Sequence, residues 1–156
     1  MASMIRKAVI PAAGFGTRFL PATKSQPKEM LSVVDTPVIQ YVVKEAVDSG
    51  ITDILMVIGR GKRAIEEHFD RHLELEAELE EKGKTEELAQ IRDVSDMANI
   101  HFVWQKELNG LGDAVRYAHD HTGDEPFAVL LGDTLIESKT PVTAQLMSIF
   151  ERYREP

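Results

Sequence analysis

The stretch VIPAAGFGTRFLPATKSQPKEM, residues 9–30, carries the residues best suited to chemistry. It begins as an apolar run, passes through small residues, and continues as a proline-punctuated loop with three cations. Gly14 and Gly16 lack a Cβ, so the backbone can turn sharply and approach a ligand closely. Their exposed N–H groups can receive phosphate oxygens. Two glycines are equally compatible with a plain turn between a strand and a loop.

The cations after the glycines favour a ligand over a plain turn. Arg18 offers a planar guanidinium that matches phosphate oxygens in pairs. Lys28 is a compact charge held next to Pro27, which limits local freedom. Lys24 is equally compatible with a solvated surface position. We therefore expect the loop to bind phosphates.

The two common phosphate-binding motifs are not present. A dinucleotide fingerprint needs a third glycine at position 19, which is Phe19. A Walker A motif ending in the GKT of residues 83–85 needs a glycine at position 78, which is Glu78. A phosphate site in this chain must therefore be built differently.

The arrangement of apolar runs predicts the elements that position this loop. Short continuous apolar runs alternate with segments of helical spacing, which is typical of an α/β fold: a Rossmann-like, mostly parallel sheet with helices on both faces. The expected strands are residues 6–13, 53–59, 100–105 and 126–133, and the expected helices are 36–50, 62–83, 85–98, 111–123 and 142–155.

Sheets of this kind bind ligands at the carboxyl ends of their strands. Three candidate elements follow expected strands: the loop 14–28, the segment from Gln105 to Gly112, and Asp133. A carboxylate such as Asp133 suits a hard cation like Mg²⁺, yet it is also common as a turn or capping residue. Gln105 could be a polar strand end, and Asn109 with Gly110 could be a mere turn.

Charge and composition exclude several other classes. The chain has 156 residues, is 43% hydrophobic and 28% charged, and carries a net charge of −8, which argues against a nucleic-acid binder. Residues 1–63 hold nine Lys/Arg and five Asp/Glu, whereas residues 64–156 hold nine and twenty-one, so the basic excess lies around the glycine loop. No apolar run is long enough for a membrane span. The lack of cysteine and of a signal-peptide pattern makes the cytoplasm the expected compartment.

The loop resembles the signature of sugar-1-phosphate nucleotidyltransferases, roughly G-x-G-T-R-x-x-P-x-T followed by P-K. The matching residues are Gly14, Gly16, Thr17, Arg18, Pro21, Thr23, Pro27 and Lys28. The longer pieces PKEML, IQYVV, GLGDAV and GDEPFAVLLGD are similar to the bacterial UTP–glucose-1-phosphate uridylyltransferase branch of that family. The likeness runs from about residue 5 to residue 135. One departure is Thr134, where a second Asp often follows Asp133.

The resemblance implies a role for each candidate residue. Arg18 and Lys28 would be the catalytic cations that face the phosphates, Gln105 would read the base, and Asp133 would bind Mg²⁺. Ala12, Ala13 and Gly14 would lie against the uracil and ribose. The full UTP-binding set implied is Ala12, Ala13, Gly14, Gly16, Thr17, Arg18, Lys28, Gln105 and Gly110.

The activity implied by the resemblance is the transfer of UMP from UTP to glucose 1-phosphate, which gives UDP-glucose and pyrophosphate. Two alternatives stay open: a catalytically incompetent nucleotide-binding fragment or regulatory relative, and a related transferase that uses another sugar or base, such as dTTP. Enzymes of this kind have much longer chains. We therefore expect residues 1–156 to be the nucleotide-binding portion, with the sugar-binding part absent and homo-oligomers formed at full length.

Overall fold

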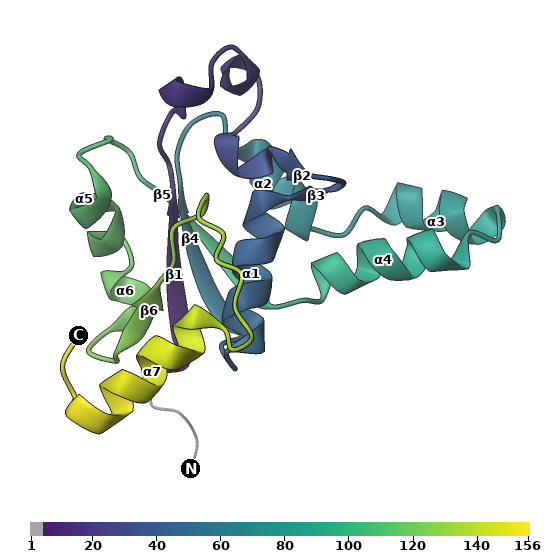
Figure 1. Cartoon of the computed structure of the whole chain (residues 1–156). Helices are drawn as coiled ribbons and strands as arrows, with labels where there is room; N and C mark the ends of the chain where they lie inside the picture. The colour runs from purple at the N-terminus through teal and green to yellow at the C-terminus, as the bar shows by residue number, and fades with distance from the viewer. Residues whose placement is uncertain (1–4) are drawn as a thin grey trace.

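Four parallel strands form the central sheet, and the computed structural model describes residues 5–156 (Figure 1). The strands are β1 (Lys7–Ala12), β4 (Asp53–Ile58), β5 (Asn99–Trp104) and β6 (Phe127–Val129), in the order β5-β4-β1-β6. β1 pairs along its whole length with β4, from Lys7 opposite Asp53 to Ala12 opposite Ile58. The expected α/β architecture is confirmed.

The sheet is covered on both faces (Figure 1). On one face α1 (Val38–Asp48) and α2 (Arg63–Phe69) pack over alternate strand residues such as Ile10 and Met56. On the other face α5 (Leu111–Arg116) and the short α6 (His119–Thr122) cover Val9, Leu55 and Val57. Because both faces are buried, β1 and β4 are apolar after their first residues, Lys7 and Asp53, rather than alternating, which made them recognisable.

Helix α7 (Val142–Tyr153) packs against α1. The Glu45 carboxylate of α1 accepts a hydrogen bond of 2.8 Å from the Thr143 N–H in the first turn of α7. A carboxylate at this position satisfies a free helix N–H and complements the helix dipole. No helix formed by residues 5–156 is long and apolar enough to cross a membrane.

Three expected elements differ from the structure. The expected helix 62–83 is divided into α2 and α3 (Leu73–Glu81), because Asp70 is extended and His72 begins a new helix by accepting a hydrogen bond from the Leu75 N–H. The expected helix 111–123 is divided into α5 and α6 around Tyr117. The expected strand 126–133 is shortened to β6, since it pairs with β1 only as far as Val129 and then leaves the sheet. A two-stranded antiparallel ribbon, β2 (Ser32–Val33) with β3 (Thr36–Pro37), was not expected.

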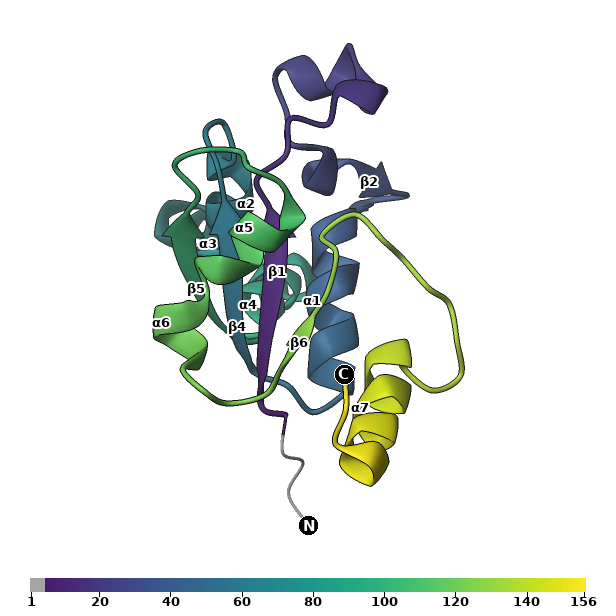
Figure 2. The same ribbon diagram turned by 90° about the vertical axis from the view of Figure 1, so that its left-hand side faces the viewer.

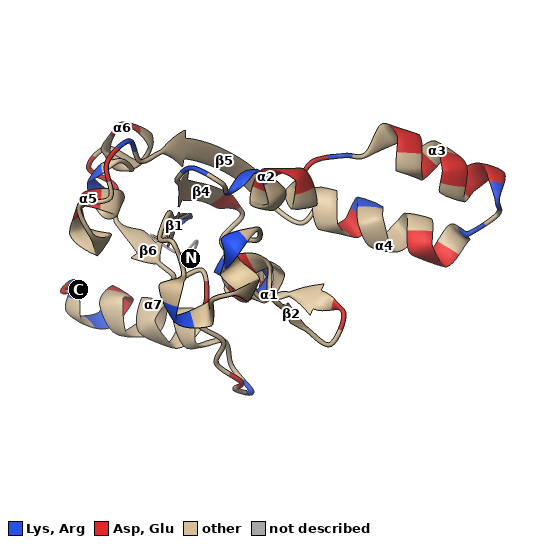
Figure 3. Cartoon of the chain, turned by 90° about the horizontal axis from the view of Figure 1, so that it is seen from above, with Lys and Arg blue, Asp and Glu red and all other residues tan. Residues whose placement is uncertain are grey.

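Helices α3 and α4 (Thr85–Ser95) form an antiparallel arm that projects from the body and carries many acidic residues (Figure 3). Glu76 of α3 is only 4% exposed and accepts hydrogen bonds from Arg71 and Arg92. The Arg71 hydrogen bonds, followed by that of Arg92, lower the pKa of Glu76 to about 2. The charged form is thus held by its partners despite its burial.

We predict that Glu76→Gln lowers the thermal unfolding midpoint by several degrees at pH 7. Because the folded pKa lies below the unfolded value of about 4.3, the stabilisation is complete above that value and is lost as the pH falls towards about 2. The gap between the variant and the unsubstituted protein should therefore close over that range in differential scanning calorimetry. Glu80→Gln, at an exposed position on the same helix, is the control. A gap that stays constant with pH contradicts this account.

Candidate functional site

The chain reverses its direction of winding between β1 and β6. From β1 the chain proceeds to β4 and β5 on one side of the sheet, and then returns to place β6 on the other side of β1. The loops that follow β1 and β6 leave the sheet at the same end (Figure 2). In open parallel sheets, this divergence creates a crevice outside the carboxyl ends of the strands, where ligands bind.

Lys28 and Asp133 meet at this end of the sheet. Lys28 Nζ lies 2.6 Å from Asp133 Oδ2, although the two residues are 105 positions apart in the chain. Their side chains are 23% and 34% exposed, so the pair is reachable from solvent. The structure therefore brings together the expected phosphate cation and the expected metal ligand, each from a different loop.

Gly16 is required by the way the loop folds back on itself. Its φ is +65°, and a Cβ there would lie 3.0 Å from Lys28 Cβ. Thr23 Oγ1 donates a hydrogen bond of 2.7 Å to the Gly16 carbonyl. The glycine and threonine of the motif thus close the loop against the Lys28 stem, which fixes where the lysine begins.

Arg18 lies in a short 3₁₀ turn, Thr17–Phe19, and is exposed. Within residues 5–156 its guanidinium has no ion pair or side-chain hydrogen bond. The structure does not bring it into contact with Lys28 or Asp133. Thr17 is exposed in the same turn, so both side chains point into solvent beside the loop.

Ala12 and Ala13 are buried where β1 ends, whereas Gly14 is exposed. A Cβ on Gly59, which follows β4, would lie 3.0 Å from the Ala13 carbonyl oxygen. The segments that follow β1 and β4 therefore run very close together just past the sheet. Small residues at positions 12 and 13 leave the Gly14 backbone accessible.

Gln105 and Gly110 are brought together after β5. Gln105 is 6% exposed, and its Nε2 donates to Asp113 Oδ2 at 2.9 Å and to the Gly110 carbonyl at 3.5 Å. Both bonds use the amide nitrogen, so Oε1 can accept a hydrogen bond from a ligand. Gly110 has a φ of +92°, which favours glycine at this helix start.

The sequence reasoning missed a second ion pair beneath the first. Glu29, adjacent to Lys28, is 1% exposed and accepts a hydrogen bond of 2.7 Å from Lys62 Nζ. The local signal for it is weak: a charged residue beside the buried Met30 in the run PKEML.

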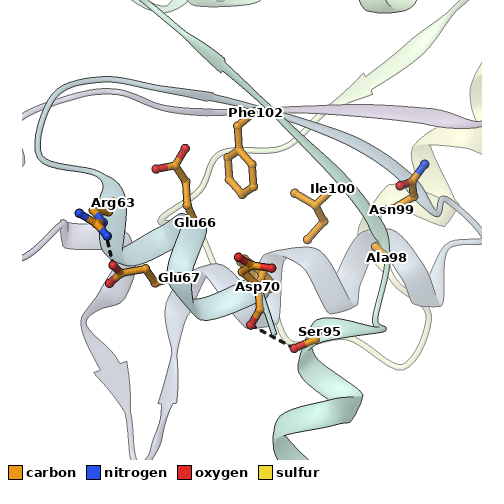
Figure 4. Close-up of a pocket in the computed structure, with 10 residues that line it drawn as sticks. Arg63, Glu66, Glu67, Asp70, Ser95, Ala98, Asn99, Ile100 and Phe102 are labelled. Atoms are coloured by element: carbon orange, nitrogen blue, oxygen red, sulfur yellow. Dashed lines mark hydrogen bonds and ion pairs between the residues drawn. The ribbon is translucent and has the colours of Figure 1, made fainter. Parts of the chain in front are cut away.

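A cavity near the opposite edge of the sheet does not fit a nucleotide. It has a volume of about 630 Å³ and lies between α2, α4 and β5 (Figure 4). Its charged lining includes Glu66, Glu67 and Asp70, and its Arg63 is paired with Glu67 at 2.8 Å. A triphosphate would be repelled there. None of the expected site residues lines it.

The sheet order and its switch point define the chain as a doubly wound α/β protein. A family model described as "Nucleotidyl transferase" matches residues 7–155, and the chain belongs to that family. The expected resemblance is thereby confirmed.

The relatives make the comparison more specific. The chain is 61% identical over 153 residues to UTP–glucose-1-phosphate uridylyltransferase YngB of Bacillus subtilis (strain 168). This alignment covers 98% of this chain and 52% of that protein. It is 58% identical to the UTP–glucose-1-phosphate uridylyltransferase of Staphylococcus haemolyticus (strain JCSC1435), in an alignment that covers 94% of this chain and 51% of that protein. This chain therefore spans about half the length of the curated relatives it matches.

Solved structures agree with the fold. A UTP-bound UGPase from Acinetobacter baumannii superposes with a TM-score of 0.92 at 44% identity and covers 96% of this chain and 54% of its own. A UDP-glucose pyrophosphorylase complexed with UDP-glucose superposes with a TM-score of 0.80 at 39% identity, over 96% of this chain and 55% of its own.

We predict that Gly16→Ala lowers the free energy of unfolding, since a left-handed backbone costs an L-residue about 1–2 kcal/mol and the new Cβ would press on Lys28. Gly14→Ala is the matched control, because a Cβ at Gly14 meets nothing within 4 Å. Urea denaturation measures both. Equal losses for the two variants would show that the Gly16 conformation is not required.

Proposed function

We propose that this chain binds UTP with Mg²⁺ and forms the nucleotide-binding portion of an enzyme that transfers UMP from UTP to glucose 1-phosphate. The observation that carries the proposal is the contact between Lys28 and Asp133 at the switch point of the sheet. The names of the relatives supply the base and the sugar.

Lys28 and Arg18 act on the phosphates in this proposal. The ammonium of Lys28 leaves Asp133 for the triphosphate, and the exposed Arg18 folds over it from the 3₁₀ turn. Both cations neutralise charge that develops on pyrophosphate as the bond between the α-phosphorus and its bridging oxygen breaks. An oxygen of glucose 1-phosphate forms the new bond to the α-phosphorus, so no protein nucleophile is needed. The main contribution of the protein is to position two anions that repel each other.

Asp133 suits a magnesium ion. Its carboxylate is hard, partly exposed and adjacent to the proposed phosphate site. Among residues 5–156 there is no group of three His, Cys, Asp or Glu side chains that could hold a metal, so most ligands would come from phosphates and water, as Mg²⁺ commonly accepts. When bound, the ion would neutralise the phosphates and the departing pyrophosphate.

Gln105, Gly110 and the β1 end receive the nucleoside. The Gln105 Oε1 can accept the uracil N3–H, while its Nε2 is held by Asp113 and Gly110. The small Ala12 and Ala13 leave room for the base and ribose beside Gly14.

The proposed division into two portions has support on the opposite side of β6. Among the strands of residues 5–156, β6 has a neighbour on one side only, and a groove of about 690 Å³ lies between α1, residues 129–138 and α7. Exposed apolar side chains surround it: Leu131, Leu135, Ile136 and Leu146. Such a surface is typical of an interface. We assign residues 1–156 to the nucleotide-binding portion, of which residues 1–4 lie outside the described structure, and this groove to contact with the sugar-binding portion.

We predict that this chain binds UTP with Mg²⁺ and that Lys28→Ala weakens the binding by about tenfold or more, since a charge-assisted contact contributes about 1.5–3 kcal/mol. Lys24→Ala is the matched control, because Lys24 is an exposed lysine of the same loop. Isothermal titration calorimetry measures all three proteins. No affinity of the unsubstituted chain for UTP, or equal losses for the two variants, contradicts the proposed function.

We also predict that Asp133→Asn removes most of the gain in UTP affinity that Mg²⁺ gives. Without metal, the same variant should bind UTP at least as tightly as the unsubstituted chain, because Lys28 no longer pairs with a carboxylate. Titrations with and without MgCl₂ separate these effects. An undiminished response of the variant to Mg²⁺ would place the ion elsewhere.

A further inference from the structure

The Glu29–Lys62 pair is a buried connection between loops. Lys62 Nζ lies 2.7 Å from Glu29 Oε2, and the two side chains are 5% and 1% exposed. Within residues 5–156 no other ion pair hides both partners this completely. Glu29 follows β1, whereas Lys62 follows β4 at the start of α2.

The pair lies directly below the Lys28–Asp133 contact. A Cβ on Gly132, the residue before Asp133, would lie 3.3 Å from Glu29 Cγ and 3.5 Å from Ala12 Cβ. The Glu29 side chain is thus wedged between the end of β1 and the loop after β6. It connects three loops: the one that carries Lys28, the one that carries Asp133, and the one that begins α2.

Lys28 and Glu29 share one 3₁₀ turn, Lys28–Met30, but face opposite ways. Lys28 is partly exposed and points to Asp133, while Glu29 points inward to Lys62. Because the residues are adjacent, a rotation of the turn that moved Glu29 would also displace the Lys28 ammonium. Anchoring the carboxylate therefore fixes the cation.

Stability alone does not account for this pair. Removing two charges from water is costly, and an apolar pair of similar volume is often as stable or more stable. An ion pair, in contrast with an apolar contact, imposes a definite direction and distance. The burial of this pair directly under the proposed phosphate site indicates a geometric role.

We propose that Glu29 and Lys62 are positioning residues for the UTP site: they set the height and direction of Lys28 relative to Asp133, so that a triphosphate and its metal fit between them. This inference rests on the proposed function. We assign Lys62 a positioning role because its ammonium is buried against Glu29, with a side chain only 5% exposed.

The test compares the double variant Glu29→Met/Lys62→Met with the unsubstituted chain. Two unbranched apolar side chains can pack together, so the unfolding midpoint of the double variant should lie close to that of the unsubstituted chain. It should lie above the midpoints of the single variants Glu29→Met and Lys62→Met, because each single variant leaves a buried charge without its partner. Its affinity for UTP with MgCl₂, measured by calorimetry, should nevertheless be weaker by about tenfold or more, as for other supporting residues around a site. Lys82→Met, which breaks an exposed pair with Glu78, is the control and should change neither quantity.

Recovery of both stability and UTP affinity in the double variant overturns the inference, because it shows a purely structural role. Glu29→Asp provides a second route if the double variant does not fold: it keeps the charge but shortens the side chain, and unchanged UTP affinity in that folded variant also overturns the inference. A lack of UTP binding by the unsubstituted chain overturns the proposed function and this inference together, whereas equal binding by variant and unsubstituted chain overturns this inference alone.

Discussion

The contact between Lys28 Nζ and Asp133 Oδ2 is the interaction on which the proposed site depends. It joins the loop after β1 to the loop after β6, and only the crossover that places β6 beside β1 brings those loops together. With no ligand present, each charge neutralises the other. A triphosphate with its metal would replace both partners of this contact. Phosphate oxygens would take the place of Asp133 beside the Lys28 ammonium, and the cation would take the place of Lys28 beside the Asp133 carboxylate.

A layered arrangement supports that contact. Gly16 and Thr23 close the first loop against the Lys28 stem. Beneath it, Glu29 and Lys62 connect the first loop to the start of α2. The sheet contributes rigidity, since β1 and β4 pair over six residues each and are buried on both faces. The site residues of the loops are thus attached to the central sheet, as a preorganised site requires.

Sequence reasoning was effective where the signal is local. The largely buried strands β1 and β4 are mainly apolar runs, β5 is apolar over part of its length, and the cations of the first loop stand out in an acidic chain. It failed where tertiary contacts determine the ends of helices and strands. The division of the expected helix 62–83 depends on a cap by His72. β6 ends early because its chain leaves the sheet after Val129, although β1 continues to Ala12.

The candidate site shows the same division. Residue type, motif resemblance and position after strands predict Lys28, Asp133 and Gln105, whereas the contact between Lys28 and Asp133 is visible only in the structure. The Glu29–Lys62 pair escaped prediction because residues 33 positions apart carry no periodic signal, and a charged residue next to a motif lysine is normally expected to be solvated.

The most direct test of the central claim is a crystal structure of this chain with UTP and Mg²⁺. We predict that the triphosphate lies between the loops after β1 and β6, with Lys28 on phosphate oxygens, Asp133 on the metal, and their mutual ion pair opened. A nucleotide bound elsewhere, with the Lys28–Asp133 contact intact, would contradict the account.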